Sequence, residues 1–243
     1  NVIASFIFSG MTGSEVADAT GLGLMEIEAM EKAGYRKDFA AAVTASSANI
    51  GPVFPPSIPM LFYSLISGAS VGRLFLGGMV PGVLLAVVLM IAITILAYKR
   101  GYGRGAKFVL SETLKEFIKA FPALLTPVVL LTGLYTGIIT ATEAGALAGF
   151  YALLIAIFVY RVMDLKALWE VVVDTVITTG YISTMVASAL VFLSIVAENN
   201  IPSYVEGYFS ALVDYPLVLF FAIAAFWLVM GMFINTSVQT LIF

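Results

Sequence analysis

The sequence predicts an all-α membrane protein: a multi-span helical bundle with re-entrant hairpins and a broken helix. Of its 243 residues, 61% are hydrophobic and 11% are charged. A soluble domain is about 45–50% apolar and about 25% charged, and its surface cannot hide such an excess. Several apolar runs approach or exceed the roughly 20 residues of a spanning helix, and Gly-, Ser- and Pro-rich breaks interrupt them.

The composition also excludes several classes of function. The formal net charge is −3, and no basic patch is dense enough to bind nucleic acid. The chain has no Cys and no His, which removes thiolate metal sites, Cys nucleophiles and the commonest general base. We therefore expect no enzyme, no cofactor and no transition metal. Because the chain begins at Asn1 and stops at Phe243 inside apolar runs, we expect an internal fragment of a longer membrane subunit.

The first predicted elements are a hairpin and a broken helix. An apolar run over residues 1–11 meets the break at 9–14, and a helix follows to about residue 32. A second helix, over residues 39–50, breaks at 51–56, where three prolines remove amide donors. A simple Pro kink is the alternative reading of this second break.

The remaining predicted elements are apolar spans and one amphipathic helix. In residues 111–121, Leu114, Phe117, Ile118 and Phe121 share one face, and Thr113 and Glu116 have the spacing of a capping box. We expect a helix at about 109–121 to lie along the membrane interface; a short helix packed within a loop is the alternative. The predicted apolar runs are 74–98, 122–139, 144–160, 175–196 and 216–234.

Charge placement predicts the orientation of these spans. Three basic clusters lie at 32–37, 99–119 and 161–166, whereas the segment 198–214 has acids but no Lys or Arg. The positive-inside rule puts the basic clusters in the cytoplasm, with Arg73 as the exception. The ends of the chain then become hairpins that enter from opposite faces, as in an inverted repeat. We expect a transport domain at 1–68, scaffold spans at 69–215 and a truncated second hairpin at 216–243.

The two breaks carry the candidate chemistry. Irregular backbone at membrane depth is tolerated where it is buried in protein or lines a watery cavity, and its free carbonyls coordinate cations in secondary transporters. Thr12 with Glu15, and Thr140 with Glu143, also have capping-box spacing, and for Glu143 we favour capping over a proton relay. Asp18 either contacts the site or braces the hairpin.

Six motifs together resemble one known family. They are FSGMTGSEVAD at 8–18, GY at 34–35, FAAAVTA at 39–45, GPVFPPSI at 51–58, GIITATEA at 137–144 and GMFINT at 231–236. They resemble the large membrane subunit of tripartite ATP-independent periplasmic (TRAP) transporters of the dicarboxylate and sialic acid type. The resemblance covers essentially the whole chain.

The resemblance implies a function and its partners. The fold would be an ion-transporter-like elevator with inverted repeats, the second incomplete here, in a bacterial or archaeal inner membrane. Na⁺ would be the coupling ion for symport of an organic anion, usually a carboxylate such as a C4-dicarboxylate or sialic acid. A periplasmic substrate-binding protein would deliver it, and a small membrane subunit would complete the complex. A membrane-embedded enzyme and a passive channel without sodium coupling are the alternatives.

The resemblance also implies site residues. One sodium site would use Ser9 and Thr12 with backbone at Gly51, Phe54 and Pro55. A second would use Gly231 with residues beyond Phe243, and the substrate would lie near Ser14, Asp18 and Asn49. The sequence departs from the family at three positions: Thr12 replaces a common Ser, Ala141 the usual Pro, and Asn235 the usual Asp. Because the family's second broken helix is absent, we do not expect these residues alone to transport.

Overall fold

The computed structural model describes residues 1–102, 110–136, 139–200 and 214–242. Within these ranges the regular structure is helical and no strand is present, which confirms the predicted all-α class. The chain forms two compact units, Asn1–Asp164 and Leu165–Phe243.

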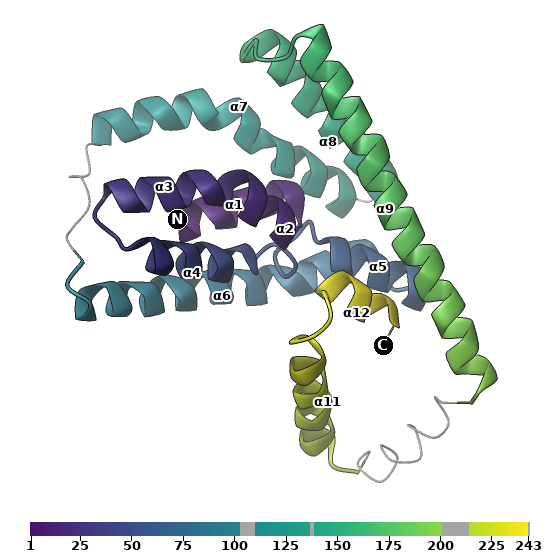
Figure 1. Cartoon of the computed structure of the whole chain (residues 1–243). Coiled ribbons are helices and arrows are strands. Elements are labelled where there is room, and N and C mark those ends of the chain that lie inside the picture. The colour runs from purple at the N-terminus through teal and green to yellow at the C-terminus, as the bar shows by residue number, and fades with distance from the viewer. Residues whose placement is uncertain (103–109, 137–138, 201–213, 243) are drawn as a thin grey trace. The chain divides into compact units, whose positions relative to one another are not determined.

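The first unit begins with a helical hairpin (Figure 1). Its first arm is α1 (Val2–Thr12), and its second arm runs through α2 (Glu15–Ala17) and the π-helix η1 (Asp18–Leu22) into α3 (Gly23–Lys32). Gly13 ends α1 in the left-handed conformation, and the Ser14 hydroxyl caps the second arm by accepting from the N–H of Ala17 at 3.3 Å. The helix therefore starts from Ser14, and the expected capping box of Thr12 with Glu15 is wrong.

The broken helix follows the hairpin. Helix α4 (Lys37–Ala48) ends before the Pro-rich segment, and α5 (Ile58–Ser67) restarts after it with Ser57 as its N-cap. The Ser57 hydroxyl accepts from the N–H of Met60 at 3.3 Å and donates to the carbonyl of Pro52. Nine residues separate the two helices, so the break is a loop of defined structure rather than a kink.

Within the described residues, four helices are long and apolar enough to cross a membrane. They are α6 (Val71–Lys99), the part of α7 (Leu110–Tyr135) from Leu114, α8 (Ala141–Leu154) with its π-helical continuation η2 (Ile155–Val159), and α9 (Leu165–Glu198) up to Val196. Most of their apolar side chains are exposed, which fits contact with lipid tails. The chain is thus a multi-pass integral membrane protein.

Helix α7 differs from its prediction. The sequence favoured an amphipathic helix at about 109–121 and a separate span from residue 122, but one helix runs through Pro122 and Pro127. A proline removes one amide donor and bends a helix without necessarily ending it. Residue 109 and the side chain of Thr113 lie outside the described residues, and the interfacial placement stays a prediction.

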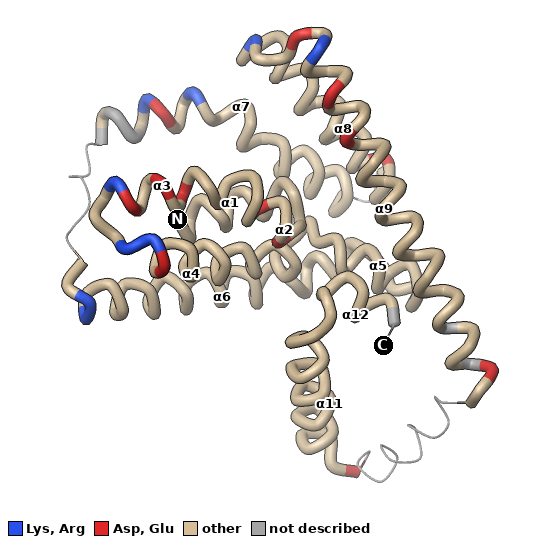
Figure 2. Tube along the Cα trace, viewed as in Figure 1, with Lys and Arg blue, Asp and Glu red and all other residues tan. Residues whose placement is uncertain are grey.

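The first unit packs the hairpin against the broken helix and α6. Val2, Ile50 and Ala86 form a buried cluster with partly buried Phe6 and Phe54 around it. Basic residues of the α3–α4 turn, the end of α6 and the beginning of α7 gather at one end of this unit, at the left of Figure 2. This clustering agrees with the predicted common side for those segments.

The second unit contains α9, α11 (Pro216–Met230) and α12 (Thr236–Ile242). The side chain of Asn235 caps α12 by accepting from the N–H of Ser237 at 3.0 Å. An amide oxygen thus does at Asn235 what a carboxylate would do at a helix N-terminus. Residues 201–213 of the predicted acidic segment lie outside the described residues, and the three predicted domain ranges stay predictions.

Candidate functional site

The two helix breaks of the first unit touch each other. The N–H of Ile58 donates to the carbonyl of Gly13 at 3.3 Å. A Cβ added at Gly13 would lie 2.3 Å from the carbonyl oxygen of Pro56, and one at Gly51 would lie 3.2 Å from the carbonyl carbon of Ser14. Only residues without a side chain permit this approach. Segments nearly 40 residues apart in the sequence therefore meet as one backbone junction.

Two hydroxyl side chains lie on the last turn of α1, before Gly13. Ser9 is fully buried and donates to the carbonyl of Ser5 at 2.7 Å, and partly buried Thr12 donates to the carbonyl of Phe8 at 3.3 Å. Each hydroxyl donates its hydrogen bond to a carbonyl one turn earlier in its own helix. The oxygen lone pairs remain available as acceptors or as ligands of a cation.

The facing loop supplies carbonyl oxygens. Among the hydrogen bonds of the described residues, none is accepted by the carbonyls of Gly51, Phe54 or Pro55. Gly51 and Pro55 are buried. Buried carbonyls normally find a partner, and hard cations prefer oxygen ligands of this kind. The residues predicted for the first sodium site thus fit a small cation by their chemistry.

The three predicted substrate residues lie in different environments. Ser14 caps the second arm beside Gly51. Asn49 is exposed, and its side-chain amide donates to the carbonyl of Ala45 at 2.9 Å. Asp18 is 1% exposed, and neither of its carboxylate oxygens accepts a hydrogen bond. Ser14 thus lies at the junction, Asn49 is exposed at the end of α4, and Asp18 is buried.

A polar cluster next to this junction was missed by sequence reasoning. The Ser5 hydroxyl donates to Ser47 at 2.9 Å and lies 3.4 Å from both carboxylate oxygens of Glu26. Asn1 donates to the Thr44 hydroxyl at 2.7 Å on the same side. Two features of the sequence could have indicated this cluster. Ser5 lies one helical turn before Ser9, and the hydroxyl residues Thr44 and Ser47 lie three residues apart on α4.

Gly231 lies in the second unit, where α11 ends. Its N–H donates to the carbonyl of Trp227 at 2.8 Å, and the side-chain amide of Gln239 donates to the same carbonyl at 2.9 Å. Gln239 is 4% exposed. This buried amide ties α12 back to the end of α11, an interaction that the sequence did not indicate.

The Thr140–Glu143 pair forms the predicted capping box. The N–H and hydroxyl of Thr140 lie 2.7 and 2.8 Å from one carboxylate oxygen of Glu143, and the N–H of Glu143 donates back to that hydroxyl at 3.3 Å. Both side chains are exposed. Helix capping thus accounts for Glu143 without a proton relay. Residues 137–138 of the same motif lie outside the described residues.

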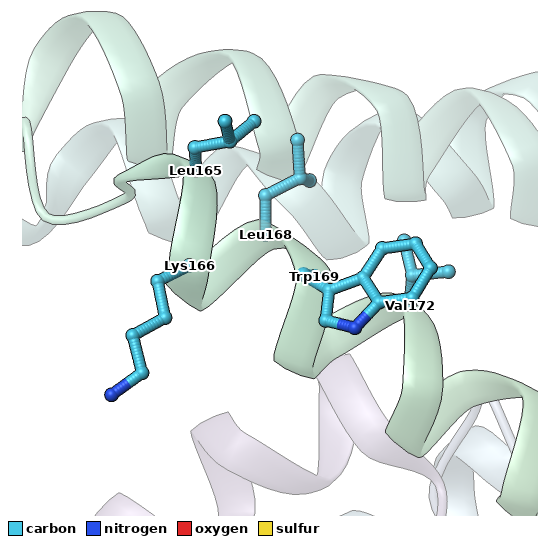
Figure 3. A pocket seen from close by; sticks show the side chains of 5 residues that line it. All are labelled: Leu165, Lys166, Leu168, Trp169 and Val172. Carbon is cyan, nitrogen blue, oxygen red and sulfur yellow. The ribbon is translucent and has the colours of Figure 1, made fainter.

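A groove of about 640 Å³ lies along the beginning of α9 (Figure 3). Its apolar side chains have the i, i+3, i+4, i+7 spacing of one helix face, and the Lys166 side chain extends away from the others: the lining is Leu165, Lys166, Leu168, Trp169 and Val172. Polar groups do not converge here as they do in a site for a small polar ligand. The groove suits acyl chains or an apolar helix better.

Comparison with known proteins covers the whole chain. The family model described as "Tripartite ATP-independent periplasmic transporter, DctM component" matches residues 1–243. The sialic acid TRAP transporter large permease protein SiaM of Vibrio cholerae is 41% identical over 97% of this chain and 55% of its own length. The 2,3-diketo-L-gulonate TRAP transporter large permease protein YiaN of Escherichia coli is 34% identical over 99% of this chain and 57% of its own.

A third relative names another substrate. The C4-dicarboxylate TRAP transporter large permease protein DctM of Pseudomonas aeruginosa is 32% identical over 99% of this chain and 56% of its own length. The chain thus spans about half the length of these curated relatives.

Proposed function

Since the chain belongs to the family of DctM components of tripartite ATP-independent periplasmic transporters, we propose that it forms part of a sodium-coupled core that carries an organic anion across the membrane. The family is one of transporters and not of enzymes. The observation that carries the proposal is the contact between the two helix breaks, where Gly13 and Gly51 lie, beside loop carbonyls that accept no hydrogen bond within the described residues.

The proposed first sodium site lies at this contact. The hydroxyl oxygens of Ser9 and Thr12 would bind Na⁺ from the hairpin, and the carbonyls of Gly51, Phe54 and Pro55 would bind it from the loop. A cation held between the two segments stabilises the arrangement in which they touch. Coupling follows if substrate favours that same arrangement, because each ligand then raises the affinity for the other.

The proposed substrate is a carboxylate. Relatives are named for sialic acid, 2,3-diketo-L-gulonate and C4-dicarboxylates, which are all organic acids. We propose that the anion comes from a periplasmic substrate-binding protein, that a small membrane subunit completes the complex in the inner membrane, and that Ser14 and Asn49 face the anion. The substrate contact of Asp18 and the second sodium site at Gly231 stay predictions.

The proposal is tested by uptake in proteoliposomes that hold the complete transporter. We expect accumulation of the acid with a Na⁺ gradient and none when K⁺ replaces Na⁺. The double variant Ser9→Ala with Thr12→Ala should raise the Na⁺ concentration for half-maximal uptake about tenfold or more, equivalent to about 1.4 kcal/mol, because two ligand oxygens are lost.

A matched control is Thr20→Ala. The Thr20 hydroxyl also donates to a carbonyl one turn back, at 2.7 Å from Val16, but it is exposed. The Thr20→Ala variant should leave the sodium dependence of uptake unchanged. Wild-type sodium affinity in the double variant would place the site elsewhere. Uptake that continues at the same rate in K⁺ would favour a passive channel.

A further inference from the structure

Two acidic side chains are buried inside the hairpin, next to the junction of the breaks. Asp18 on η1 is 1% exposed and Glu26 on α3 is 7% exposed. Helices α1 and α4 pack against this part of the hairpin. Carboxylates almost never become fully buried without a partner, so their position needs a physical explanation.

The donors around the two acids do not satisfy them. Neither oxygen of Asp18 accepts a hydrogen bond. The Ser5 hydroxyl lies beside Asp18 and makes only long contacts, 3.4 Å, with the two carboxylate oxygens of Glu26. Its short hydrogen bond, 2.9 Å, goes to Ser47, which in turn donates to the side-chain oxygen of Asn1 at 3.0 Å. The short hydrogen bonds of this chain therefore do not end on either carboxylate.

Among the residues that the structure describes, no Lys or Arg pairs with Asp18. Lys32 at the end of α3 is exposed and pairs with Glu28 at 2.7 Å, and Lys37 is exposed at the start of α4. Asp18 adds a like charge near Glu26. An unpaired buried carboxylate carries a large desolvation penalty. A bound monovalent cation would balance one of the two negative charges and so lower this penalty.

We propose that the carboxylates of Asp18 and Glu26, with the hydroxyls of Ser5 and Ser47, bind one Na⁺ at a site separate from Ser9 and Thr12. All its ligands are hard oxygens, as a small hard cation requires. The Ser5 carbonyl accepts the hydrogen bond of the Ser9 hydroxyl at 2.7 Å, so this site braces α1 directly below the junction. The proposal does not depend on the transport function, because it concerns ion binding to the protein when no transport takes place.

The test counts bound ions in the complete protein, purified in detergent, with ²²Na⁺ as the probe and choline as the replacing cation. Asp18→Asn and Glu26→Gln should each lose about one Na⁺ per chain or weaken its binding about tenfold or more. Glu28→Gln is the matched control, because Glu28 lies on the same helix but is exposed. It should bind as many ions as the wild type.

Two further variants separate this site from the proposed coupling site. The double variant Ser9→Ala with Thr12→Ala should still bind the Na⁺ that Asp18→Asn loses. The experiment can therefore contradict one of the two proposed sites without contradicting the other. Ser5→Ala removes one neutral ligand without changing charge and should weaken the same ion. Circular dichroism at 222 nm and gel filtration establish that each variant is folded. An unchanged ion count in folded Asp18→Asn overturns the proposal, as would happen if a proton neutralises the pair.

Discussion

Gly13 is the residue on which the contact between the breaks depends. It has a φ of +62°, and a Cβ there would lie 2.3 Å from the carbonyl oxygen of Pro56. Gly13→Ala should therefore add overlap with backbone to the cost of a left-handed Ala, about 2–4 kcal/mol together. Thermal unfolding in detergent, followed by circular dichroism, measures the loss.

Gly68→Ala provides the control for Gly13. Gly68 also ends its helix in the left-handed conformation, with a φ of +70°, but nothing lies within 4 Å of an added Cβ. It should cost only about 1–2 kcal/mol, the conformational part. Equal losses for the two variants would mean that the breaks do not touch at Gly13.

Individual residues were predictable where their role is local. The Thr140–Glu143 box forms as its spacing predicts, because both partners lie within one helical turn. Ser14, not Thr12, caps the hairpin's second arm, because Gly13 in the left-handed conformation delays the restart of the helix. The burial of Asp18 depends on helices distant in sequence, and no local pattern specifies it.

At the scale of elements, substitutions in the capping box of α8 distinguish a structural role of Glu143 from a role in proton transfer. Gln can replace Glu in a capping box, so Glu143→Gln should change stability by less than about 0.5 kcal/mol and leave uptake intact. Thr140→Ala should cost about 1 kcal/mol through lost capping. Thermal unfolding and sodium-driven uptake measure both effects. Loss of uptake in a stable Glu143→Gln variant would instead indicate a proton relay.

The ends of helices were predictable from Gly and Pro only where these residues act as helix caps. Gly68 ends α5 in the left-handed conformation that is typical of a glycine after a helix. Pro122 was read as the beginning of a new span, but α7 passes through it and through Pro127. A Pro inside an apolar segment ends a helix in one context and bends it in another, and the neighbouring helices decide which.

At the scale of the molecule, the sequence predicted a membrane bundle because an apolar composition leaves few alternatives. It also predicted two helix breaks, and the structure adds that they meet at Gly13 and Gly51. This contact joins segments separated by α3 and α4. Periodicity describes each helix alone, so the pairing had no signal except the glycines and prolines that permit it.

The orientation of the molecule is tested on α6, which joins Arg73 to Lys99. With 29 residues, α6 is about 44 Å long at about 1.5 Å per residue and exceeds the roughly 30 Å hydrocarbon layer. Both residues are exposed. These 243 residues contain no Cys, so a label found within them reports the substituted position alone. In intact cells a membrane-impermeant maleimide should label Arg73→Cys and not Lys99→Cys.

The predicted labelling pattern depends on the basic cluster at the end of α6. Helix α6 ends at Lys99, and this end of the helix lies where Lys and Arg residues of the first unit gather (Figure 2). The positive-inside rule places that end in the cytoplasm. Inside-out vesicles should therefore reverse the labelling of the two variants. Val87→Cys, at an exposed apolar position within the span, should stay unlabelled in both preparations. Labelling of Lys99→Cys from outside would invert the predicted topology.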